Sequence, residues 1–418
     1  MKILIIAKGF LPYMFSENLV NGKLALAMLE EGWEIDVISS KEEGESYSAI
    51  WKEPFSVLKP FTHEVEVEKT SQVNRILDYI ASLFSMSFYP IPGIRWGVRA
   101  LKKAYQLNQN KKYDVIISRS PDDLSHLVAY QFAKKTNTPW IANWNDPAFS
   151  IWPEPYKEKQ TLLTKYLYDH FIKKLISRAS INTFPSNNLR QHFIKELSLN
   201  NGEINTEVIP HIGLVNKYLP VAGLNVDKGD VVRICHAGNL SKERNPEILF
   251  QAIKGINETQ IPKVQLDIMG FVNDYTKDLI RKYKLEESVK FIGSFDFFDA
   301  LSKMRQYDFL LLVEAPLDNG IFFPSKIVDY VQSNVPILGF SPPLGFVNDL
   351  LSFHKAGIPL NNLDYNMTLE SLLNMIKLKN DGNIKSLFSN QSLENEFSSS
   401  SVIQIYKDIF SRFKIYHN

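Results

Sequence analysis

Residues 113–143, with the sequence YDVIISRSPDDLSHLVAYQFAKKTNTPWIAN, carry the pattern from which the fold class of this chain follows. The stretch opens and closes on apolar runs, Tyr113–Ser118 and Pro139–Asn143, which predict two short strands. Between them, Leu124–Lys135 repeats apolar side chains at helical spacing. A strand, a helix and a second strand in succession are typical of a parallel sheet covered by helices.

The same alternation continues along the rest of the chain. In the first half it predicts further strands at Met1–Ala7, Glu34–Ser39 and Ser180–Phe184, with helices at about 17–31, 95–108, 161–178 and 187–197. In the second half it predicts strands at Val231–His236, Lys263–Met269, Ser288–Ile292, Asp308–Val313, Pro336–Phe340 and Gly357–Leu360. We therefore expect two α/β domains, each a doubly wound parallel sheet, facing one another across a cleft. Because ligands of such sheets bind beyond the carboxyl ends of the strands, the loops that follow the strands are the candidate sites.

Residues 200–230 separate the two halves, because they carry Asn, Gly, Pro and Asp with little periodicity. We expect an N-terminal domain over residues 1–205, a linker over 206–229 and a C-terminal domain over 230–400. The last residues, 401–418, have apolar side chains at helical spacing and predict a helix that packs back on the N-terminal domain.

The composition excludes several classes of protein. Over 418 residues, 47 lysines and arginines balance 46 aspartates and glutamates to a net charge of +1, so no overall field would hold nucleic acid and an anion site must be local. The single cysteine, Cys235, lies in an apolar run, which favours a buried thiol in a reducing compartment over a disulfide. The start MKILIIAKGF predicts a strand rather than a signal peptide, and no apolar run is long enough to span a membrane, so we expect a cytoplasmic protein.

The loop after the first strand of the second half is the first candidate anion site. It reads HAGNLSKERNP over residues 236–246 and leads into a helix. Backbone N–H groups around Gly238 and Asn239, together with Lys242 or Arg244, would form a cradle for a diphosphate. The alternative is an ordinary strand-to-helix loop whose charges are solvated.

The second candidate is the loop that reads EAPLDNGIFFPSK over residues 314–326 and leads into a helix. Ser325 suits the N-cap position, whereas Lys326 puts a cation in a first turn that favours an anion, a conflict that a bound phosphate would resolve. Asp329, one turn further on, would reach the hydroxyls of a ribose. The alternatives are a solvated lysine and a surface acid.

Several motifs together resemble a known family. They are DVIISRSPDDLSHL (114–127) and PWIANWNDP (139–147) in the first half, and HAGNLSKERNP (236–246), IMGF (268–271), FIGSF (291–295) and PSKIVDYVQSNVPIL (324–338) in the second. Their order and spacing resemble the GT-B glycosyltransferases, specifically retaining glycosyltransferase family 4 and its bacterial polysaccharide-type members. The resemblance implies a nucleotide-diphospho-sugar held by the C-terminal domain and an acceptor held mainly by the N-terminal domain. It also implies transfer with retention, with no obligatory metal and no other cofactor.

The resemblance assigns roles to residues of the donor site. Arg244 matches the basic residue that neutralises the leaving diphosphate, Lys326 would assist it, and Asp329 matches the acid that binds the ribose. Two positions depart from the family pattern, because Asn239 replaces an arginine and Ile321 replaces the acid that contacts the donor sugar. The candidates that could take over from the missing acid all lie in one loop and are Glu314, Asp318 and the backbone of Asn319, Gly320, Ile321, Phe322 and Phe323.

The acceptor is expected at loops of the first half. Asn21 and Gly22 stand where the family frequently has two glycines, and would let the backbone approach the diphosphate unless Gly22 serves helix packing instead. Asp146 would align the acceptor or relay its proton, because an acid at the carboxyl end of a strand has no packing role. Further candidates, with structural roles as the alternative for the histidines, are Ser120, His126, Asn145 and His211. No cluster of His, Cys, Asp and Glu has the spacing of a metal site.

A surface feature of the first half suggests a membrane contact. The segment Arg75–Tyr89 is apolar around much of a predicted helix, and Arg95, Arg99, Lys102 and Lys103 follow it. Such a segment can rest on the inner face of the cytoplasmic membrane and admit a lipid-linked acceptor. The alternatives are an oligomer contact and a helix buried in the N-terminal domain.

These observations favour a transferase that moves a hexose-type unit from a uridine or guanosine diphosphate to a glycan or lipid-linked oligosaccharide. A surface polysaccharide of the capsule or O-antigen kind is the expected product. Two alternatives are a non-catalytic GT-B subunit that binds nucleotide sugars, favoured by Asn239 and Ile321, and a nucleotide-sugar epimerase of the same architecture.

Overall fold

The computed structural model divides the chain into two compact units. The described residues are 1–41, 50–67, 76–77, 80, 93–200, 202, 204–220, 229, 231–258, 264–271 and 273–414. The first unit comprises Met1–Trp152, Lys157–Val215 and Ser399–Asn418, and the second comprises Pro153–Tyr156 and Asn216–Ser398. The four residues Pro153–Tyr156 thus group with the second unit although both flanking segments belong to the first.

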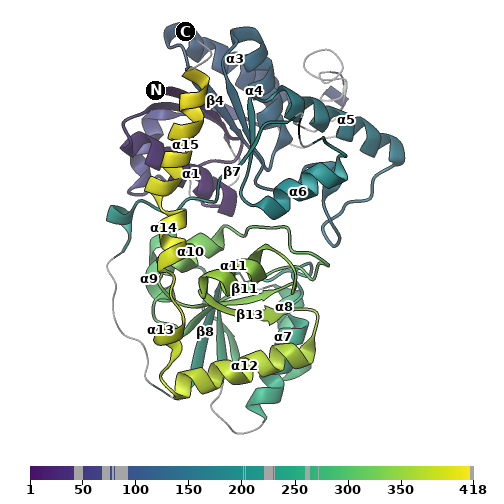
Figure 1. The fold of residues 1–418 in the computed structure, drawn as a ribbon, viewed down its shortest axis with the longest axis vertical. Coiled ribbons are helices and arrows are strands. Elements are labelled where there is room, and N and C mark those ends of the chain that lie inside the picture. The colour runs from purple at the N-terminus through teal and green to yellow at the C-terminus, as the bar shows by residue number, and fades with distance from the viewer. Residues whose placement is uncertain are drawn as a thin grey trace. The chain divides into compact units, whose positions relative to one another are not determined.

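The first unit is built on a parallel sheet of seven strands (Figure 1). The strands are β1 (Lys2–Ile6), β2 (Glu34–Lys41), β3 (Thr62–Glu66), β4 (Val115–Arg119), β5 (Trp140–Asn143), β6 (Ile181–Phe184) and β7 (Thr206–Val208), in the order β3-β2-β1-β4-β5-β6-β7. Strand order reverses between β1 and β4, which pair in parallel with Ile3 opposite Val115. The loops after these two strands therefore part on opposite faces of the sheet and leave a crevice at its carboxyl edge.

Helices connect the strands of the first unit. They are α1 (Ser16–Glu30), α3 (Ile94–Asn110), α4 (Asp123–Thr136), α5 (Leu162–Arg178) and α6 (Asn187–Glu196), with short 3₁₀ turns η1 (Phe55–Phe61) and η3 (Phe149–Ile151). The C-terminal helix α15 (Ser399–Lys414) belongs to the same unit, where Lys407 pairs with Glu31 at 2.5 Å and Phe410 contacts the ring of Trp33. Figure 1 shows α15 beside α1, as the helical spacing of residues 401–418 predicts.

The second unit repeats the architecture with a parallel sheet of six strands. These are β8 (Val232–Ala237), β9 (Val264–Met269), β10 (Val289–Phe291), β11 (Phe309–Val313), β12 (Ile337–Ser341) and β13 (Gly357–Asn361), in the order β10-β9-β8-β11-β12-β13. Its helices are η4 (Asn216–Tyr218), α7 (Glu247–Asn257), α8 (Asp274–Tyr283), α9 (Phe297–Met304), α10 (Lys326–Gln332), α11 (Phe346–His354), α12 (Tyr365–Asn380), α13 (Ile384–Leu387) and α14 (Gln391–Phe397). Here the strand order reverses between β8 and β11.

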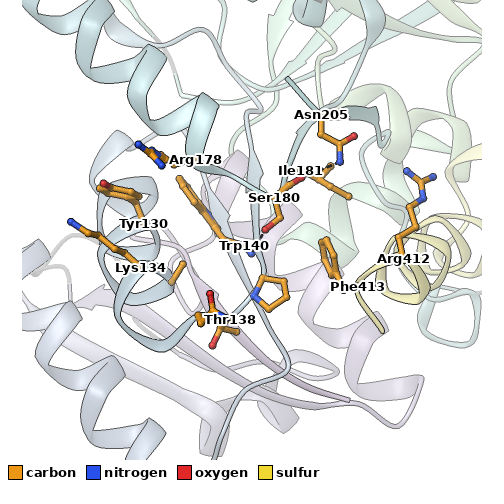
Figure 2. A pocket seen from close by; sticks show the side chains of 13 residues that line it. Tyr130, Lys134, Thr138, Trp140, Arg178, Ser180, Ile181, Asn205, Arg412 and Phe413 are labelled. Atoms are coloured by element: carbon orange, nitrogen blue, oxygen red, sulfur yellow. Dashed lines mark hydrogen bonds between the residues drawn. The ribbon is translucent and has the colours of Figure 1, made fainter. Parts of the chain in front are cut away.

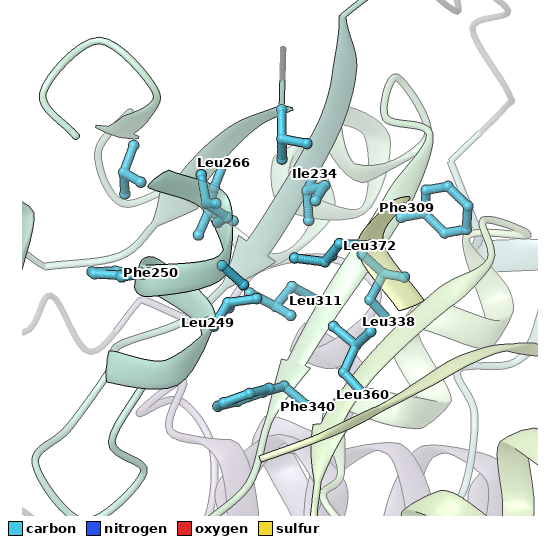
Figure 3. Packing of buried hydrophobic residues seen from close by; sticks show 14 of the residues in the cluster. Ile234, Leu249, Phe250, Leu266, Phe309, Leu311, Leu338, Phe340, Leu360 and Leu372 are labelled. Atoms are coloured by element: carbon cyan, nitrogen blue, oxygen red, sulfur yellow. The ribbon is translucent and has the colours of Figure 1, made fainter. Parts of the chain in front are cut away.

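The sequence of β11 explains why this sheet is covered on both faces. Phe309, Leu311 and Val313 enter one hydrophobic cluster, shown in Figure 3, and Leu310 and Leu312 enter the cluster on the other face. Successive side chains of a strand point to opposite faces, so an unbroken apolar run requires helices on both. Cys235 of β8 is fully buried in the second cluster, which confirms the interpretation of this thiol as a small core residue.

The predicted fold class is confirmed, with two exceptions in detail. The alternation of apolar runs did not predict β3 or β7. The predicted linker over 206–229 also begins too early, because β7 lies within it and pairs with β6 as the edge strand of the first sheet. Within the described ranges, no helix is long and apolar enough to cross a bilayer. Of the segment Arg75–Tyr89, only Ile76, Leu77 and Ile80 are described, with exposed fractions of 62%, 44% and 47%, and the rest lies outside the described residues.

Candidate functional site

The two predicted anion-binding loops of the second unit meet at the edge where its strand order reverses. Residues 238–246 follow β8 and residues 314–325 follow β11, and these strands are neighbours in the sheet. In a doubly wound sheet this is the place where ligands bind. The topology therefore brings together loops that lie about seventy residues apart in the sequence.

Gly238 and Lys326 are in direct contact at this edge. The φ angle of Gly238 is +138°, which L side chains rarely adopt, and a Cβ built on it would lie 2.1 Å from Lys326 Nζ. The backbone conformation therefore favours glycine here, and a larger side chain would displace the lysine amine. The ammonium group consequently lies over the backbone of the loop that follows β8.

Arg244 and Lys326 share this edge, and the repulsion between their charges contributes to a lowered pKa of Lys326. Burial, followed by the nearby charge of Arg244, lowers the pKa of Lys326 to about 8, against the opposing effect of Glu314 and Asp329. A bound anion would relieve both causes, because it compensates the charge and replaces the lost hydration. The electrostatics thus suit a phosphate or diphosphate.

His236 forms the floor of the same site and is a residue that the sequence analysis did not single out. Its Nδ1 lies 2.9 Å from the carbonyl oxygen of Leu311, which can only accept, so Nδ1 carries the proton and Nε2 is an acceptor. Burial, Lys326 and Arg244 lower the pKa of His236 to about 3, which keeps the ring neutral. The histidine therefore adds no charge to the site.

Polar side chains hold the loop after β8 in place. Asn239 Oδ1 accepts a hydrogen bond from the Phe271 N–H at 2.7 Å, and Asn273 Nδ2 donates to the Leu240 carbonyl at 2.9 Å. Asn239, predicted to bind the donor, thus uses its side-chain oxygen to tie the loop to the end of β9. Lys242 is exposed at the tip of the loop.

The loop after β11 has less free backbone than the sequence analysis expected. The Gly320 N–H donates to the Leu344 carbonyl at 2.8 Å, and its carbonyl accepts from the Phe346 N–H at 2.9 Å. The prediction that the Gly320 N–H binds a sugar hydroxyl is therefore wrong, because the bridge to residues 344–346 already uses it. Asp318 and Asn319 are exposed, whereas Ile321 is buried.

Helix α10 begins without the side-chain cap that the sequence analysis expected from Ser325. Ser325 precedes the helix but its side chain accepts no hydrogen bond from a helix N–H, so the predicted capping role is wrong. Asp329 lies one turn beyond Lys326, half-buried, and its carboxylate acts electrostatically on that lysine. Glu314 is buried at the end of β11 and acts on Lys326 in the same sense.

Tyr156 completes this site from a distant part of the sequence. Its hydroxyl accepts a hydrogen bond from Arg244 Nε at 3.3 Å, and its ring lies edge-on to Phe322, with centroids 5.6 Å apart. Tyr156 belongs to the four residues that group with the second unit. Sequence reasoning missed it because nothing in WPEPY marks a residue whose neighbours are 88 and 166 positions away.

The first unit gathers acids and amides at its own carboxyl edge. Asn145, two residues beyond β5, donates from Nδ2 to Glu17 Oε2 at 2.7 Å. Burial, followed by the charge of Asp146, raises the pKa of Glu17 to about 7, while Arg119 and Asn145 oppose this shift. Asp146 was predicted to be near the acceptor and Glu17 was missed, because an acid in the first turn of a helix is an ordinary stabilising feature.

Arg119 and Ser120, at the end of β4, contact α1 and the residue that follows β5 by two positions. Arg119 Nε donates to Asn21 Oδ1 at 2.5 Å, and Ser120 Oγ accepts from the Asn145 N–H at 2.6 Å. His211 is buried and lines a very small cavity together with Arg119 and Asn145. The structure thus brings together most of the predicted acceptor residues.

Two predicted acceptor residues lie elsewhere. A Cβ on Gly22 would lie 2.3 Å from Leu11 Cδ1, so this glycine permits close packing of α1 and the packing alternative holds. His126 is fully buried, with Nδ1 2.7 Å from Ser118 Oγ and its ring 4.0 Å from that of Trp144. Burial and then Arg119 lower its pKa to about 3, so its role is structural and the prediction of a sugar contact is wrong.

A larger cavity, of about 770 Å³, lies at the opposite edge of the first sheet (Figure 2). Its lining includes Trp140 and Ile181, at the starts of β5 and β6, with Lys134 and Arg178 from the last turns of α4 and α5. Cations are favoured at the carboxyl ends of helices whether or not a ligand binds. Among the described residues, no group of three or more His, Cys, Asp or Glu side chains is placed to hold a metal ion.

Comparison with known proteins supports this architecture. Residues 225–313, which include the loop after β8, match the family model described as glycosyl transferases group 1. No curated protein sequence matches the chain.

Solved structures match over nearly the whole length. Sucrose-phosphate synthase from Thermosynechococcus elongatus is 15% identical with a TM-score of 0.67, covering 99% of this chain and 100% of its own. HepE from Anabaena, solved in complex with UDP-glucose, is 17% identical with a TM-score of 0.68 and the same coverage. The lipopolysaccharide outer core galactosyltransferase WaaB, in its apo form, is 14% identical with a TM-score of 0.62, again over 99% and 100% of the two chains. The chain has the GT-B fold, and the residues that match the group 1 glycosyl transferase model lie in its second unit.

Proposed function

We propose that this protein is a glycosyltransferase that moves a sugar from a nucleoside-diphospho-sugar, bound at the carboxyl edge of the second sheet, to a glycan or lipid-linked acceptor. The observation that carries the proposal is the Lys326 amine, which lies over the Gly238 backbone beside the Arg244 charge. Two cations beside a backbone without a side chain suit the negative charge of a diphosphate.

The chemistry follows from where negative charge develops. As the bond between the sugar and the diphosphate breaks, charge accumulates on the leaving oxygen, and Arg244 and Lys326 stabilise it more strongly in the transition state than before. Asp329, one turn from Lys326, is proposed to bind the ribose hydroxyls. Glu17 and Asp146, on the first unit, are proposed to orient the acceptor hydroxyl and receive its proton.

Because Arg244 and Lys326 supply the positive charge, we propose that transfer needs no resident cofactor or metal. By the resemblance of the sequence to a retaining family, we also propose that transfer proceeds with retention. HepE is solved with UDP-glucose and WaaB is named as a galactosyltransferase of lipopolysaccharide, which supports a uridine nucleotide and a surface polysaccharide as first candidates. Undiminished transfer after treatment with EDTA is the expected result.

The experiment that tests the proposal is calorimetric titration of the protein with UDP, GDP, ADP and CMP, followed by transfer assays with the sugars of the nucleotide that binds. We expect micromolar binding of one diphosphate and transfer to a glycan acceptor. Nucleotide binding without transfer would indicate the non-catalytic subunit. Interconversion of nucleotide sugars without an acceptor would indicate an epimerase, and no binding of any nucleotide would refute the donor site.

We also propose that the protein works at the inner surface of the cytoplasmic membrane, where a lipid-linked acceptor would be found. The first two turns of α5 expose Leu162, Leu163, Tyr166 and Leu167 to fractions of 89%, 67%, 68% and 42%. Exposed lysines at 157 and 159 precede these residues in the sequence, and an exposed lysine at 174 follows them on the same helix. Exposed apolar side chains on a helix with lysines nearby in the sequence suit an anionic lipid surface.

Sedimentation with vesicles tests this location. We expect recovery with phosphatidylglycerol vesicles to exceed recovery with neutral vesicles, and Leu162→Ser combined with Leu163→Ser to abolish the difference. Leu387→Ser, which changes an exposed leucine of the second unit, is the matched control. Equal recovery with both kinds of vesicle would remove the proposal.

A further inference from the structure

We propose that Tyr156 is a positioning residue of the donor site, which holds the Arg244 guanidinium ready for the diphosphate. The inference rests on the proposed function, because it assigns to Tyr156 a role in binding the donor. We call the four residues Pro153–Tyr156 the donor-site strap. The strap lies between β5 and α5 in the sequence, yet it groups with the second unit.

Tyr156 is attached to both donor-site loops of the second unit. Its hydroxyl accepts from Arg244 Nε in the loop after β8, and its ring packs edge-on against Phe322 in the loop after β11, at an interplanar angle of 82°. One contact is polar and the other is aromatic, so hydroxyl and ring can be tested separately. The strap thus bridges the two loops that the proposed ligand would occupy.

The hydrogen bond from Nε has a specific consequence for Arg244. A guanidinium has five N–H donors in a fixed plane, and a hydrogen bond at Nε does not use the terminal N–H groups, which are the ones that pair bidentately with phosphate oxygens. Arginine carries much rotamer freedom, so a side chain already held in place loses less on binding. Tyr156 would therefore increase affinity without touching the ligand.

A tyrosine suits this role better than an acid. Burial, the largest cause, raises the pKa of the Tyr156 hydroxyl, so the group stays neutral although it is close to Arg244. A carboxylate at the same place would pair with the guanidinium and cancel the charge that the diphosphate needs. Tyr156 fixes the direction of Arg244 and brings no charge of its own.

The strap is also close in the sequence to Asp146, which was predicted to contact the acceptor. Asp146 precedes Pro153 by only seven residues, and Lys157 and Lys159, both exposed, follow Tyr156 directly. A ligand that fixes Arg244 would restrain Tyr156 and hence the strap. Donor binding should therefore slow tryptic cleavage after Lys157 and Lys159.

The closing experiment removes the hydroxyl alone with Tyr156→Phe and measures binding of the nucleoside diphosphate and of the matching nucleoside by calorimetry. We expect the diphosphate affinity to fall about five- to tenfold and the nucleoside affinity to stay unchanged. In an Arg244→Ala background the same substitution should have no further effect. Tyr283→Phe, which removes a hydroxyl that accepts from Gln251 Nε2 on the same unit, is the matched control.

The outcomes separate this inference from the proposed function. If the wild type binds a diphosphate and Tyr156→Phe binds it equally well, the positioning role is wrong and the donor site stands. If the wild type binds none, the donor site is wrong and the role of Tyr156 falls with it. Proteolysis of the unaltered protein gives a second test, because an unchanged cleavage rate after Lys157 and Lys159 at saturating diphosphate would also overturn the inference.

Discussion

The carboxyl edges of the two sheets have the same strand order, and each brings together two groups of like charge, cations in the second unit and acids in the first. Beside β8 and β11, Arg244 and Lys326 lie close enough for burial and repulsion to lower the pKa of the lysine to about 8. Beside β1, β4 and β5, Glu17 and Asp146 lie close enough for burial and repulsion to raise the pKa of Glu17 to about 7. At each edge, burial and a neighbour of like charge therefore disfavour the charged form of one group, against the opposing effect of other charges in the same unit.

This difference shows that the doubly wound sheet sets the place of a site and the loops set its ligand. Paired cations favour an anion such as a diphosphate. An acid that holds a proton near neutral pH can instead exchange a hydrogen bond or a proton with a neutral hydroxyl. The proposed division of labour between a donor edge and an acceptor edge follows from these charges.

The largest expected effect comes from removing both cations of the donor edge. Arg244→Ala combined with Lys326→Ala should weaken nucleoside diphosphate binding by about two orders of magnitude or more, because each charge-assisted contact contributes roughly 1.5–3 kcal/mol. Titration calorimetry measures the loss. Lys277→Ala, which removes an exposed lysine of α8, should bind like the wild type. Equal binding by the double variant would show that the donor edge is not the anion site.

Filling the space under the lysine amine should have the next largest effect. Gly238→Ala combines a strained φ of +138° with a clash against Lys326 Nζ, so we expect a loss of about 1–3 kcal/mol in stability and at least tenfold in diphosphate affinity. Gly293→Ala is a matched control, because φ there is +91° and no atom lies within 4 Å of the added Cβ. It should lose stability alone, as measured by urea unfolding. If both variants keep full affinity, Lys326 does not bind the ligand from this position.

The pH dependence of binding should distinguish the donor edge from the acceptor edge. The protonated form of Lys326 binds the anion, so affinity should fall as pH rises through the pKa of about 8, by about tenfold between pH 7 and pH 9. At pH 8 the binding heat should depend on the buffer, because binding takes up a proton. Lys326→Arg, which keeps its charge, should flatten the profile, and an unchanged slope in this variant would assign the titration to another group.

The smallest effect is expected at the acceptor edge. The pKa of Glu17 is raised from 4.5 to about 7 in the folded protein, which therefore holds this proton more tightly than the unfolded chain does. The protonated carboxyl contributes to the free energy of unfolding in full below pH 4.5, and this contribution is lost as the pH rises through 7. Glu17→Gln removes the cost of the buried charge and should stabilise the protein at pH 8 relative to its effect at pH 5. Thermal unfolding at the two pH values measures this, with Glu370→Gln on the exposed face of α12 as control. A pH-independent effect would show that Glu17 does not titrate in this range.

Much of the donor edge could be predicted from local sequence. The run VVRICHAGN ends a strand on a glycine, and the run PSKIVDY begins a helix with a cation, so Gly238 and Lys326 could be identified separately. The roles expected of Ser325 and of the Gly320 N–H were wrong because they depend on a cap that does not form and on a bridge to residues 344–346. Backbone pairing between loops leaves no periodic signal.

The sequence by itself determined the two doubly wound sheets. A strand that is buried on both faces needs an unbroken apolar run, and a helix that covers it needs apolar side chains at helical spacing, and both patterns are visible in the local sequence. It also placed the loops that carry Arg244, Lys326 and Asp146. The tertiary structure alone decided that Lys326 lies over Gly238, that Glu17 faces Asn145 and that Tyr156 holds Arg244. Contacts between residues 88 to 128 positions apart depend on strand order and packing, and a charge acquires its perturbed pKa only from such neighbours.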